Sequence, residues 1–178
     1  MKKTYVLDTN VLIQAPYAVE CFEENTVVLP MTVLEELDNM KKEEGEKGAN
    51  VRKVIRILDA HREKGNLLEG VRMEWGGILR VEKNYRNVEL PPDLPEHKSD
   101  NRILKVCVGL SNDLKEQVIL VTKDILLRIK AQLLGIQAED FGTEQVAVHE
   151  EQYLGRREVF VPEELFKDFK KKGVPVEC

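Results

Sequence analysis

The chain alternates short apolar runs with amphipathic helical patterns, and this alternation limits the folds that it can adopt. Runs rich in Val, Ile and Leu predict strands at residues 4–7, 26–29, 79–82, 118–122 and 136–141. Between them, apolar spacing predicts helices at residues 11–22 (interrupted at Pro16), 32–40, 51–64, 100–110 and 125–134. Strands that alternate with helices form a parallel sheet covered on both faces, so the sequence predicts an α/β fold.

Length and local composition divide the chain into one domain and an appendage. With 178 residues, the chain has room for a single domain with a substantial core. We expect this domain at residues 1–142, with a charged, mobile loop at 38–50 and a Pro-rich, unpacked arm at 83–98. Residues 143–178 form a C-terminal appendage, or begin a linker to a further domain, with an expected strand at 159–161 and helix at 162–172.

Composition disfavours several classes of protein. The charged fraction of 33% and the apolar fraction of 42% are typical of a soluble globular protein, and the net charge of −5 argues against a general polyanion binder. Cys21, Cys107 and Cys178 are far apart and odd in number, which disfavours a disulfide framework or a zinc site and favours a reducing cytoplasm. No stretch approaches the roughly 20 apolar residues that cross a membrane.

Two aspartates directly follow predicted strands. Asp8 comes after Tyr5-Val6-Leu7, and Asp124 comes after the run at 118–123. In a parallel α/β sheet, ligands bind outside the carboxyl ends of the strands, so both aspartates are candidate site residues. The alternative is that each caps the helix after it. Asn10 and Thr122 lie beside them as candidate supporting residues, which orient a carboxylate or a metal-bound water or simply form turns.

Glu36 is separated from its neighbour Glu35 by helical geometry. Thr32 and Glu35 fit a capping box, which gives Glu35 a structural role at the start of the helix. Glu36 instead lies on the apolar stripe of that helix, together with Val33, Leu37 and Met40. Glu36 is therefore the candidate ligand, and the alternative is a residue at the edge of the stripe that reaches water.

Asp100 falls in the first turn of a predicted helix, where we expect Ser99 as the cap, and it is aligned with apolar positions of that helix. A favourable interaction with the helix dipole is the alternative explanation. A carboxylate that faces a core costs free energy unless a cation or hydrogen bonds compensate for its lost water. Four of them from distant stretches suggest a divalent metal ion as the partner of Asp8, Glu36, Asp100 and Asp124.

Taken together, these stretches resemble the PIN domain family. The matching segments, in the family's order and approximate spacing, are Leu7–Asn10, Pro30–Asp38, Ser99–Leu104 and Val121–Asp124. The resemblance covers about residues 1–142 and implies a three-layer α/β/α sandwich. It also implies an endoribonuclease that depends on Mg²⁺ or Mn²⁺, with Thr122 at the family's hydroxyl position and with catalytic, metal-binding acids at Asp8, Glu36, Asp100 and Asp124.

A narrower resemblance is to the PIN domain at the N-terminus of PhoH-type ATPases. It depends on Leu34-Glu35-Glu36-Leu37-Asp38 before a charged loop, and on Tyr153-Leu154-Gly155 after the domain. In that group a P-loop ATPase follows, whereas this chain contains no Gly-x-x-x-x-Gly-Lys-[Ser/Thr] motif. The resemblance therefore allows the chain to be a piece of a longer protein whose ATPase domain is its partner.

An RNA substrate requires basic residues at the rim of an acidic cleft, because the carboxylates repel phosphate. The candidates lie in the charged loop and on the helix after it, at Lys41, Lys42, Lys47, Arg52, Lys53 and Arg56. Tyr85 and Trp75 are candidates to stack on bases. The alternative is a charged helix face that is only solvated, with aromatic residues that only pack. The three histidines, His61, His97 and His149, are expected at the surface.

Three other functions remain compatible with parts of this pattern. Asp8-Thr9-Asn10 resembles the start of haloacid-dehalogenase phosphatases, but these use Asp-x-Asp, and Asn10 stands where their general acid would be. A PIN fold that binds RNA or presents a partner ATPase without cutting RNA is a second possibility. A toxin-like RNase of a toxin–antitoxin pair is a third. The oligomeric state, a homo-oligomer included, is left open.

Overall fold

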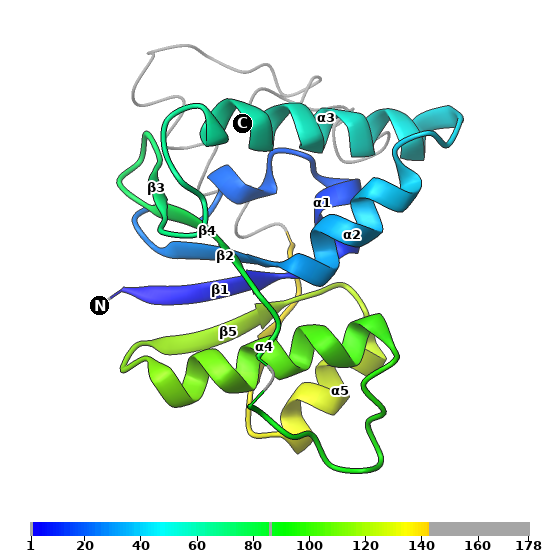
Figure 1. The fold of residues 1–178 in the computed structure, drawn as a ribbon, viewed down its shortest axis with the longest axis vertical. Helices are drawn as coiled ribbons and strands as arrows, with labels where there is room; N and C mark the ends of the chain where they lie inside the picture. The colour runs from blue at the N-terminus through cyan, green and yellow to red at the C-terminus, as the bar shows by residue number, and fades with distance from the viewer. Residues whose placement is uncertain (1, 86, 143–178) are drawn as a thin grey trace.

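One central sheet of six strands organises the computed structural model, which describes residues 2–85 and 87–142. The strands are β1 (Lys3–Leu7), β2 (Thr26–Pro30), β3 (Val71–Arg72), β4 (Ile78–Glu82), β5 (Gln117–Val121) and β6 (Gln137–Glu139). Their order is β3-β4-β2-β1-β5-β6, and the pairing is parallel except between β3 and β4. The predicted parallel sheet is confirmed, although the short antiparallel β3 was not predicted (Figure 1).

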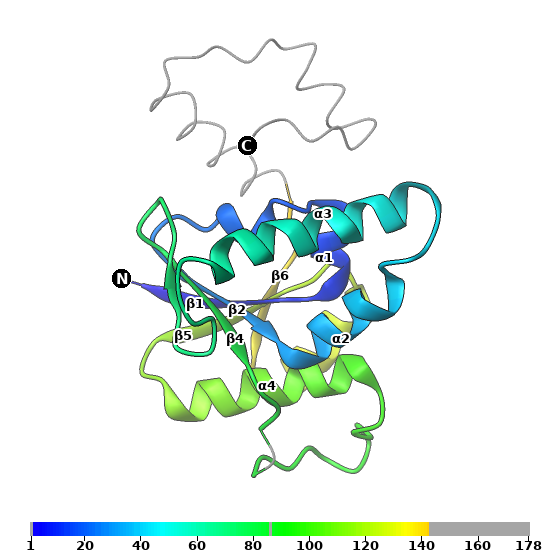
Figure 2. The same cartoon turned by 45° about the horizontal axis from the view of Figure 1, so that its top comes forward.

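Helices cover both faces of this sheet. They are α1 (Thr9–Gln14), a short 3-10 turn (Ala18–Glu20), α2 (Met31–Met40), α3 (Gly45–Arg62), α4 (Ser99–Asp113) and α5 (Ile125–Leu133). Helices α1 and α3 lie on one face and α4 and α5 on the other (Figure 2). Helix α2 follows the end of β2 and contacts both α3 and α4. The predicted three-layer α/β/α sandwich is therefore confirmed.

Burial on both faces of the sheet explains the apolar runs in the three central strands, β2, β1 and β5. Val6 on β1, Val28 on β2 and Leu120 on β5 are each fully buried, as are their neighbours Leu7, Leu29 and Ile119. A strand covered on both faces buries successive side chains, so apolar and polar residues do not alternate along it. Each such side chain stabilises the fold by about 1.5–3 kcal/mol relative to exposure.

The charged loop predicted at residues 38–50 is wrong in its extent. Helix α2 continues to Met40 and α3 begins at Gly45, so only four residues connect the two helices. The Arg52 guanidinium closes this turn by donating to the backbone oxygens of Lys41 at 2.9 Å and Glu43 at 3.1 Å. Glycines and charges in the sequence suggested a loop, but the side chain of Arg52, from within α3, holds the turn that precedes this helix.

The Pro-rich arm at residues 83–98 has no helix or strand in its described residues, as predicted, but it is packed against the body of the domain. Val88 and Leu94 are buried. The ring of Tyr85 lies over Gly109 of α4 so closely that a Cβ there would come within 2.3 Å of ring atoms. Tyr85 therefore has a packing role, and the description of the arm as unpacked is wrong.

Two predictions concern membranes and the C-terminal residues. None of the helices in the described part of the chain is long and apolar enough to cross a membrane. The strand expected at 159–161 and the helix expected at 162–172 lie outside the described residues.

The start of α3 gives a direct test of the corrected loop. A Cβ at the buried Gly48 would lie 1.7 Å from the backbone oxygen of Glu43. We expect Gly48→Ala to lower the free energy of unfolding by about 1–3 kcal/mol in urea denaturation, because the crowding outweighs the better helix propensity of Ala. The exposed neighbour gives a companion variant: Ala49→Gly should cost about 1 kcal/mol through propensity alone. A mobile loop would leave both variants close to wild-type stability.

Candidate active site

Asp8 occupies a buried position at the carboxyl end of the central strand β1. Its side chain is 7% exposed. Oδ1 accepts a hydrogen bond from the Thr9 amide at 2.7 Å, and Oδ2 accepts one from the Thr122 hydroxyl at 2.7 Å. Asp8 is also the N-cap residue of α1, so the capping alternative describes part of its role. Its two oxygens are held by one backbone group and one side chain from the neighbouring strand.

Thr122 links the ends of β1 and β5 to the start of α5. The residue is fully buried directly after β5. Its hydroxyl donates to Asp8 and accepts from the Asp124 amide at 3.0 Å. One hydroxyl therefore fixes the position of the Asp8 carboxylate relative to the backbone of the next acidic residue, which is the orienting contact expected of a supporting residue.

Glu36 reaches the same region from α2. It is half-buried, whereas Glu35 is exposed, which confirms that Glu36 is the residue on the inner face of the helix. Its Oε1 accepts from the Thr9 hydroxyl, and its Oε2 accepts from the Ser99 hydroxyl at 3.0 Å. Glu36 thus connects the first turns of α1 and α4, two elements that are distant in the sequence.

The predicted helix caps around Glu36 are wrong. Helix α2 begins at Met31 with Pro30 at its N-cap position and without a side-chain cap, and Thr32 is buried inside the first turn. Similarly, α4 has Lys98 at its N-cap position, so Ser99 is free to donate to Glu36 instead. Helix α2 thus begins two residues earlier than the local capping pattern indicated, and α4 begins one residue earlier.

Asp100 and Asp124 are engaged by different partners. Asp100, in the first turn of α4, forms a salt bridge with Lys130 of α5, whose Nζ lies 3.1 Å from Asp100 Oδ2. Asp124 is exposed and caps α5, because its Oδ1 accepts from the amides of Leu126 at 2.9 Å and Leu127 at 3.3 Å. The capping alternative therefore describes Asp124 in this structure. Asn10 is exposed in the first turn of α1.

Electrostatics couple three of the four acids. Burial raises the pKa of Asp8 above its usual range, while the hydrogen bonds from Thr122 and Thr9 lower it and the nearby charges of Glu36 and Asp124 raise it further. A carboxylate with a raised pKa beside two others marks an accumulation of negative charge that the protein stabilises only in part. Such groups are concentrated at functional sites.

The chemistry of these donors fits a hard divalent cation, because every candidate ligand is a carboxylate or hydroxyl oxygen. Across residues 2–85 and 87–142, however, no three acidic, His or Cys side chains are grouped so that they could hold an ion. The contacts explain this arrangement, since Asp100 is paired with Lys130 and Asp124 with backbone amides. Asp8 and Glu36 are the acids whose hydrogen bonds come from the site's own hydroxyls and the Thr9 amide.

The predicted RNA-binding residues are mostly exposed, but several have partners. Lys41 pairs with Asp38 at 2.7 Å on the surface, and Lys47 pairs with Glu43 at 3.6 Å. Arg52 donates to the turn before α3, as described above. Lys42 and Arg56 are exposed, and Lys53 is half-buried.

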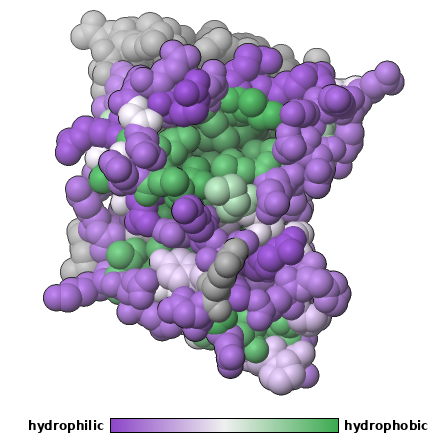
Figure 3. Space-filling view, in the orientation of Figure 1, coloured by the Kyte–Doolittle hydropathy of each residue, from purple (hydrophilic) through white to green (hydrophobic). Residues whose placement is uncertain are grey.

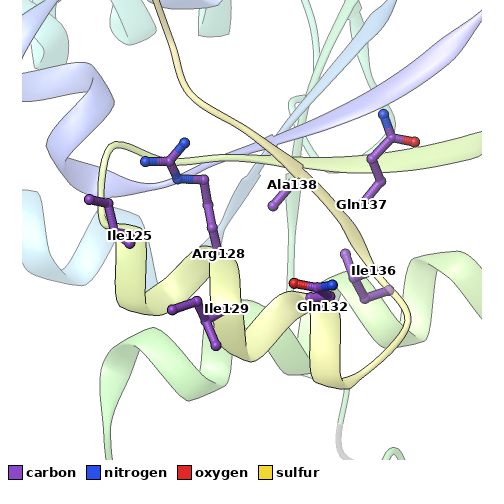
Figure 4. Close-up of a pocket in the computed structure, with 7 residues that line it drawn as sticks. All are labelled: Ile125, Arg128, Ile129, Gln132, Ile136, Gln137 and Ala138. Carbon is purple, nitrogen blue, oxygen red and sulfur yellow. The ribbon is translucent and has the colours of Figure 1, made fainter.

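Two apolar hollows are lined by residues other than the four candidate acids. Figure 3 shows an apolar region on the face that carries α2 and α3, where a hollow of about 230 Å³ is lined by Leu34, Leu37, Asp38, Lys41, Ile55 and Leu58. A second hollow of about 520 Å³ lies between α5 and β6 (Figure 4), and it is lined by Ile125, Arg128, Ile129, Gln132, Ile136, Gln137 and Ala138. None of the four candidate acids lines either hollow.

Several residues that contact the candidate acids were missed by the sequence patterns. Thr9 lies in the Asp8-Thr9-Asn10 stretch, and its position next to Asp8 was an available signal. Lys130 carries no local signal, because its partner Asp100 is 30 residues away. Of the histidines predicted at the surface, His97 is exposed but His61 is buried, with its Nε2 3.4 Å from Glu20 Oε2. His149 lies outside the described residues.

The sequence matches a known protein family over most of its length. The chain matches the PIN domain over residues 5–142. It belongs to the PIN domain family. A curated relative from Bacillus subtilis, named Protein PhoH2, is 46% identical over 175 residues, which are 95% of this chain and 40% of the relative. Protein PhoH2 from Mycolicibacterium smegmatis is 39% identical over 149 residues, 82% of this chain and 34% of the relative. The predicted resemblance to PhoH-associated PIN domains is confirmed.

Solved structures with similarity to this PIN domain include two archaeal chains. A domain of a functionally unknown protein from Methanocaldococcus jannaschii is 24% identical with a TM-score of 0.47, and covers 79% of this chain and 92% of its own. A PilT N-terminus domain protein from Sulfolobus solfataricus is 13% identical with a TM-score of 0.39, and covers 90% of this chain and 98% of its own. The chain spans only about two fifths of the length of the Bacillus subtilis relative, Protein PhoH2.

The raised pKa of Asp8 predicts a pH-dependent change in stability. A carboxyl group whose folded pKa exceeds its unfolded value stabilises the fold when protonated, and this contribution is lost as the pH rises through the folded pKa. We therefore expect Asp8→Asn to raise the free energy of unfolding at pH 7, with the difference vanishing as the pH falls below the pKa of an unfolded Asp. Urea denaturation between acidic and neutral pH measures it.

Asp93→Asn is the matched control for this experiment. Asp93 is an exposed residue of the arm at 83–98, and its charge is not among those that raise the pKa of Asp8. This variant should show little change in the pH dependence of stability. An Asp8→Asn protein less stable than wild type at pH 7 would contradict the expectation, because it would mean that hydrogen bonds outweigh burial at this carboxylate.

Proposed function

We propose that this PIN domain hydrolyses phosphodiester bonds of single-stranded RNA, using water activated by Mg²⁺ or Mn²⁺. The supporting observation is the buried Asp8 carboxylate at the carboxyl end of a parallel sheet, with the charges of Glu36 and Asp124 near enough to raise its pKa. PIN domains are generally nucleases, and this membership gives the broad class of reaction. The RNA substrate, the metal and the roles of individual residues belong to the proposal.

The residues of the site divide into ligands and supporting groups. Asp8 and Glu36 would supply the first ligand oxygens, with Asp100 and Asp124 completing the set. Thr122 orients Asp8 through its hydroxyl, while Thr9 and Ser99 hold Glu36 between two helices. When bound, a divalent ion lowers the pKa of its water and stabilises charge on the phosphate, so no protein nucleophile is required. The protein's contribution is to hold its carboxylates in place and to keep Asp8 largely withdrawn from water.

RNA contacts are proposed at the exposed basic residues around the α2–α3 turn. Lys42 and Arg56 are exposed, and Lys53 is half-buried on the same helix as Arg56. Lys41 would have to exchange its surface pair with Asp38 for phosphate, which costs little because exposed ion pairs contribute little to stability. Arg52 stabilises the turn itself, so its effect on RNA would be indirect.

The longer relatives suggest where this activity operates. Because the chain spans about two fifths of the curated relative's length, we propose that a C-terminal ATPase domain acts with the PIN domain in a longer protein. Cys21 and Cys107 are both buried and form no disulfide within the described residues, which fits a reducing cytoplasm. A homo-oligomer, and a toxin-like role for the RNase, are also compatible with this proposal.

A second candidate function has an observation in its favour. Asp100 is paired with Lys130, and Asp124 is satisfied by backbone amides, so two of the four acids already have partners. A PIN module that binds RNA for a partner ATPase without cutting it would need no further arrangement of these side chains. Cleavage assays separate the two functions.

Glu36 and Glu35 provide a matched test of catalysis. They are neighbours on α2, but Glu36 contacts the site while Glu35 is exposed. We expect Glu36→Gln to reduce the rate of Mn²⁺-dependent cleavage of end-labelled single-stranded RNA on the order of 100-fold, because a ligand oxygen loses its charge. Glu35→Gln should stay within about twofold of wild type, since surface changes rarely perturb a distant site.

Chelation and binding measurements complete the test. EDTA should abolish cleavage by the wild-type chain, and added Mn²⁺ should restore it. Cleavage that survives in Glu36→Gln at the wild-type rate would remove this site from the mechanism. RNA binding without cleavage in Mn²⁺, measured by fluorescence anisotropy, would favour the non-catalytic module.

A further inference from the structure

Lys130 is a cation held at the edge of the candidate active site by residues of another helix. It projects from α5 toward the first turn of α4. Its ammonium donates to Asp100 Oδ2 at 3.1 Å and to Asn101 Oδ1 at 3.2 Å. The side chains of Lys130 and Asp100 are 26% and 34% exposed, so the ion pair is partly withdrawn from water.

Asn101 makes this a fixed position for the ammonium. The residue is fully buried, and its side-chain amide donates to the backbone oxygen of Pro95 at 2.9 Å. That hydrogen bond directs the amide oxygen toward Lys130. This oxygen accepts a hydrogen bond from the Lys130 ammonium at 3.2 Å. The ammonium therefore has a neutral acceptor that stays in place whatever happens at Asp100.

The surface pair of Lys41 and Asp38 differs from this one. Lys41 pairs with Asp38 within a single helical turn, and both side chains are more exposed, at 45% and 66%. Lys130 and Asp100 come from two helices and are joined through a buried third residue. A pair of this kind loses less to solvent screening and side-chain entropy than a surface pair does.

We infer that Lys130 is a built-in counter-ion that competes with a divalent cation for Asp100 and thereby lowers the affinity of the site for metal. This inference rests on the proposed function, since it concerns the regulation of the same site. Asp100 Oδ2 is shared with the ammonium, and a cation that takes this oxygen must displace or repel the ammonium. Asn101 retains Lys130 after displacement, so the competing charge remains close by.

Two alternative roles of Lys130 would have different effects on metal binding. If Lys130 only packed α5 against α4, its removal would weaken the fold without strengthening metal binding. If it acted as a distant positive charge, any lysine on the same side of the sheet would have a similar effect. Lys123 offers that comparison, because its ammonium pairs with Asp140 at 3.1 Å and with the backbone oxygen of Phe141 at 2.9 Å, not with a candidate acid.

Calorimetric titration with Mn²⁺, in the absence of RNA, tests the inference on the 178-residue chain. We expect Lys130→Met to bind Mn²⁺ about tenfold more tightly than wild type, because a competing charge is gone. Lys123→Met should bind within about twofold of wild type. In an Asp100→Asn background, Lys130→Met should gain clearly less than it does in the wild-type background, since competition for the shared oxygen is gone and only the charge held by Asn101 remains.

Each outcome decides the inference. Equal or weaker Mn²⁺ binding by Lys130→Met, an equal gain in Lys123→Met, or a gain of undiminished size in the Asp100→Asn background would overturn it. Lys130→Gln, which can still hydrogen-bond Asn101, repeats the test if the methionine variant unfolds. Cleavage of RNA by the wild type together with equal Mn²⁺ affinities would overturn this inference alone. If no variant binds Mn²⁺ and wild type does not cut RNA, the inference and the proposed function both fail.

Discussion

Strand β1 pairs in parallel with β2 on one side and β5 on the other, and its register decides where the acidic residues emerge. Leu7 is paired with Val121, so the next residues, Asp8 and Thr122, leave the sheet at the same level. The Asp8 amide continues the pairing by donating to the Val121 oxygen at 3.0 Å. The contact between carboxylate and hydroxyl is thus a consequence of strand pairing, and a shift of register would remove it.

Four acidic side chains near the end of one sheet require four different kinds of compensation. Asp8 is largely withdrawn from water and keeps a raised pKa despite two hydrogen bonds. Glu36 is held by two hydroxyls, Asp124 by backbone amides at a helix start, and Asp100 by an ammonium. This division explains how the fold tolerates the acids together, because no two of them depend on the same donor group for a charge-assisted contact.

The sequence predicted the layers and the inner position of Glu36, because both depend on local periodicity: buried strands read as apolar runs, and the stripe of α2 distinguishes Glu36 from Glu35. It failed where a side chain has a partner far along the chain. Ser99 is a residue type that commonly caps helices, but its hydroxyl donates to Glu36, 63 residues away. Likewise, Arg52 closes a turn that looked like a mobile loop. Local patterns contain no information about such contacts, and the roles of the site residues remain predictions.

Strand β2 ends at Pro30 and α2 begins at Met31, with no connecting loop between them. The direction of Glu36 is therefore tied to the sheet through one uninterrupted stretch of backbone. A single residue inserted or deleted between Pro30 and Glu36 would turn the carboxylate by about 100° around the helix axis. In evolutionary terms, length variation among descendants of this chain should accumulate in the arm at 83–98 or the turn before α3, while the spacing from Pro30 to Glu36 stays constant.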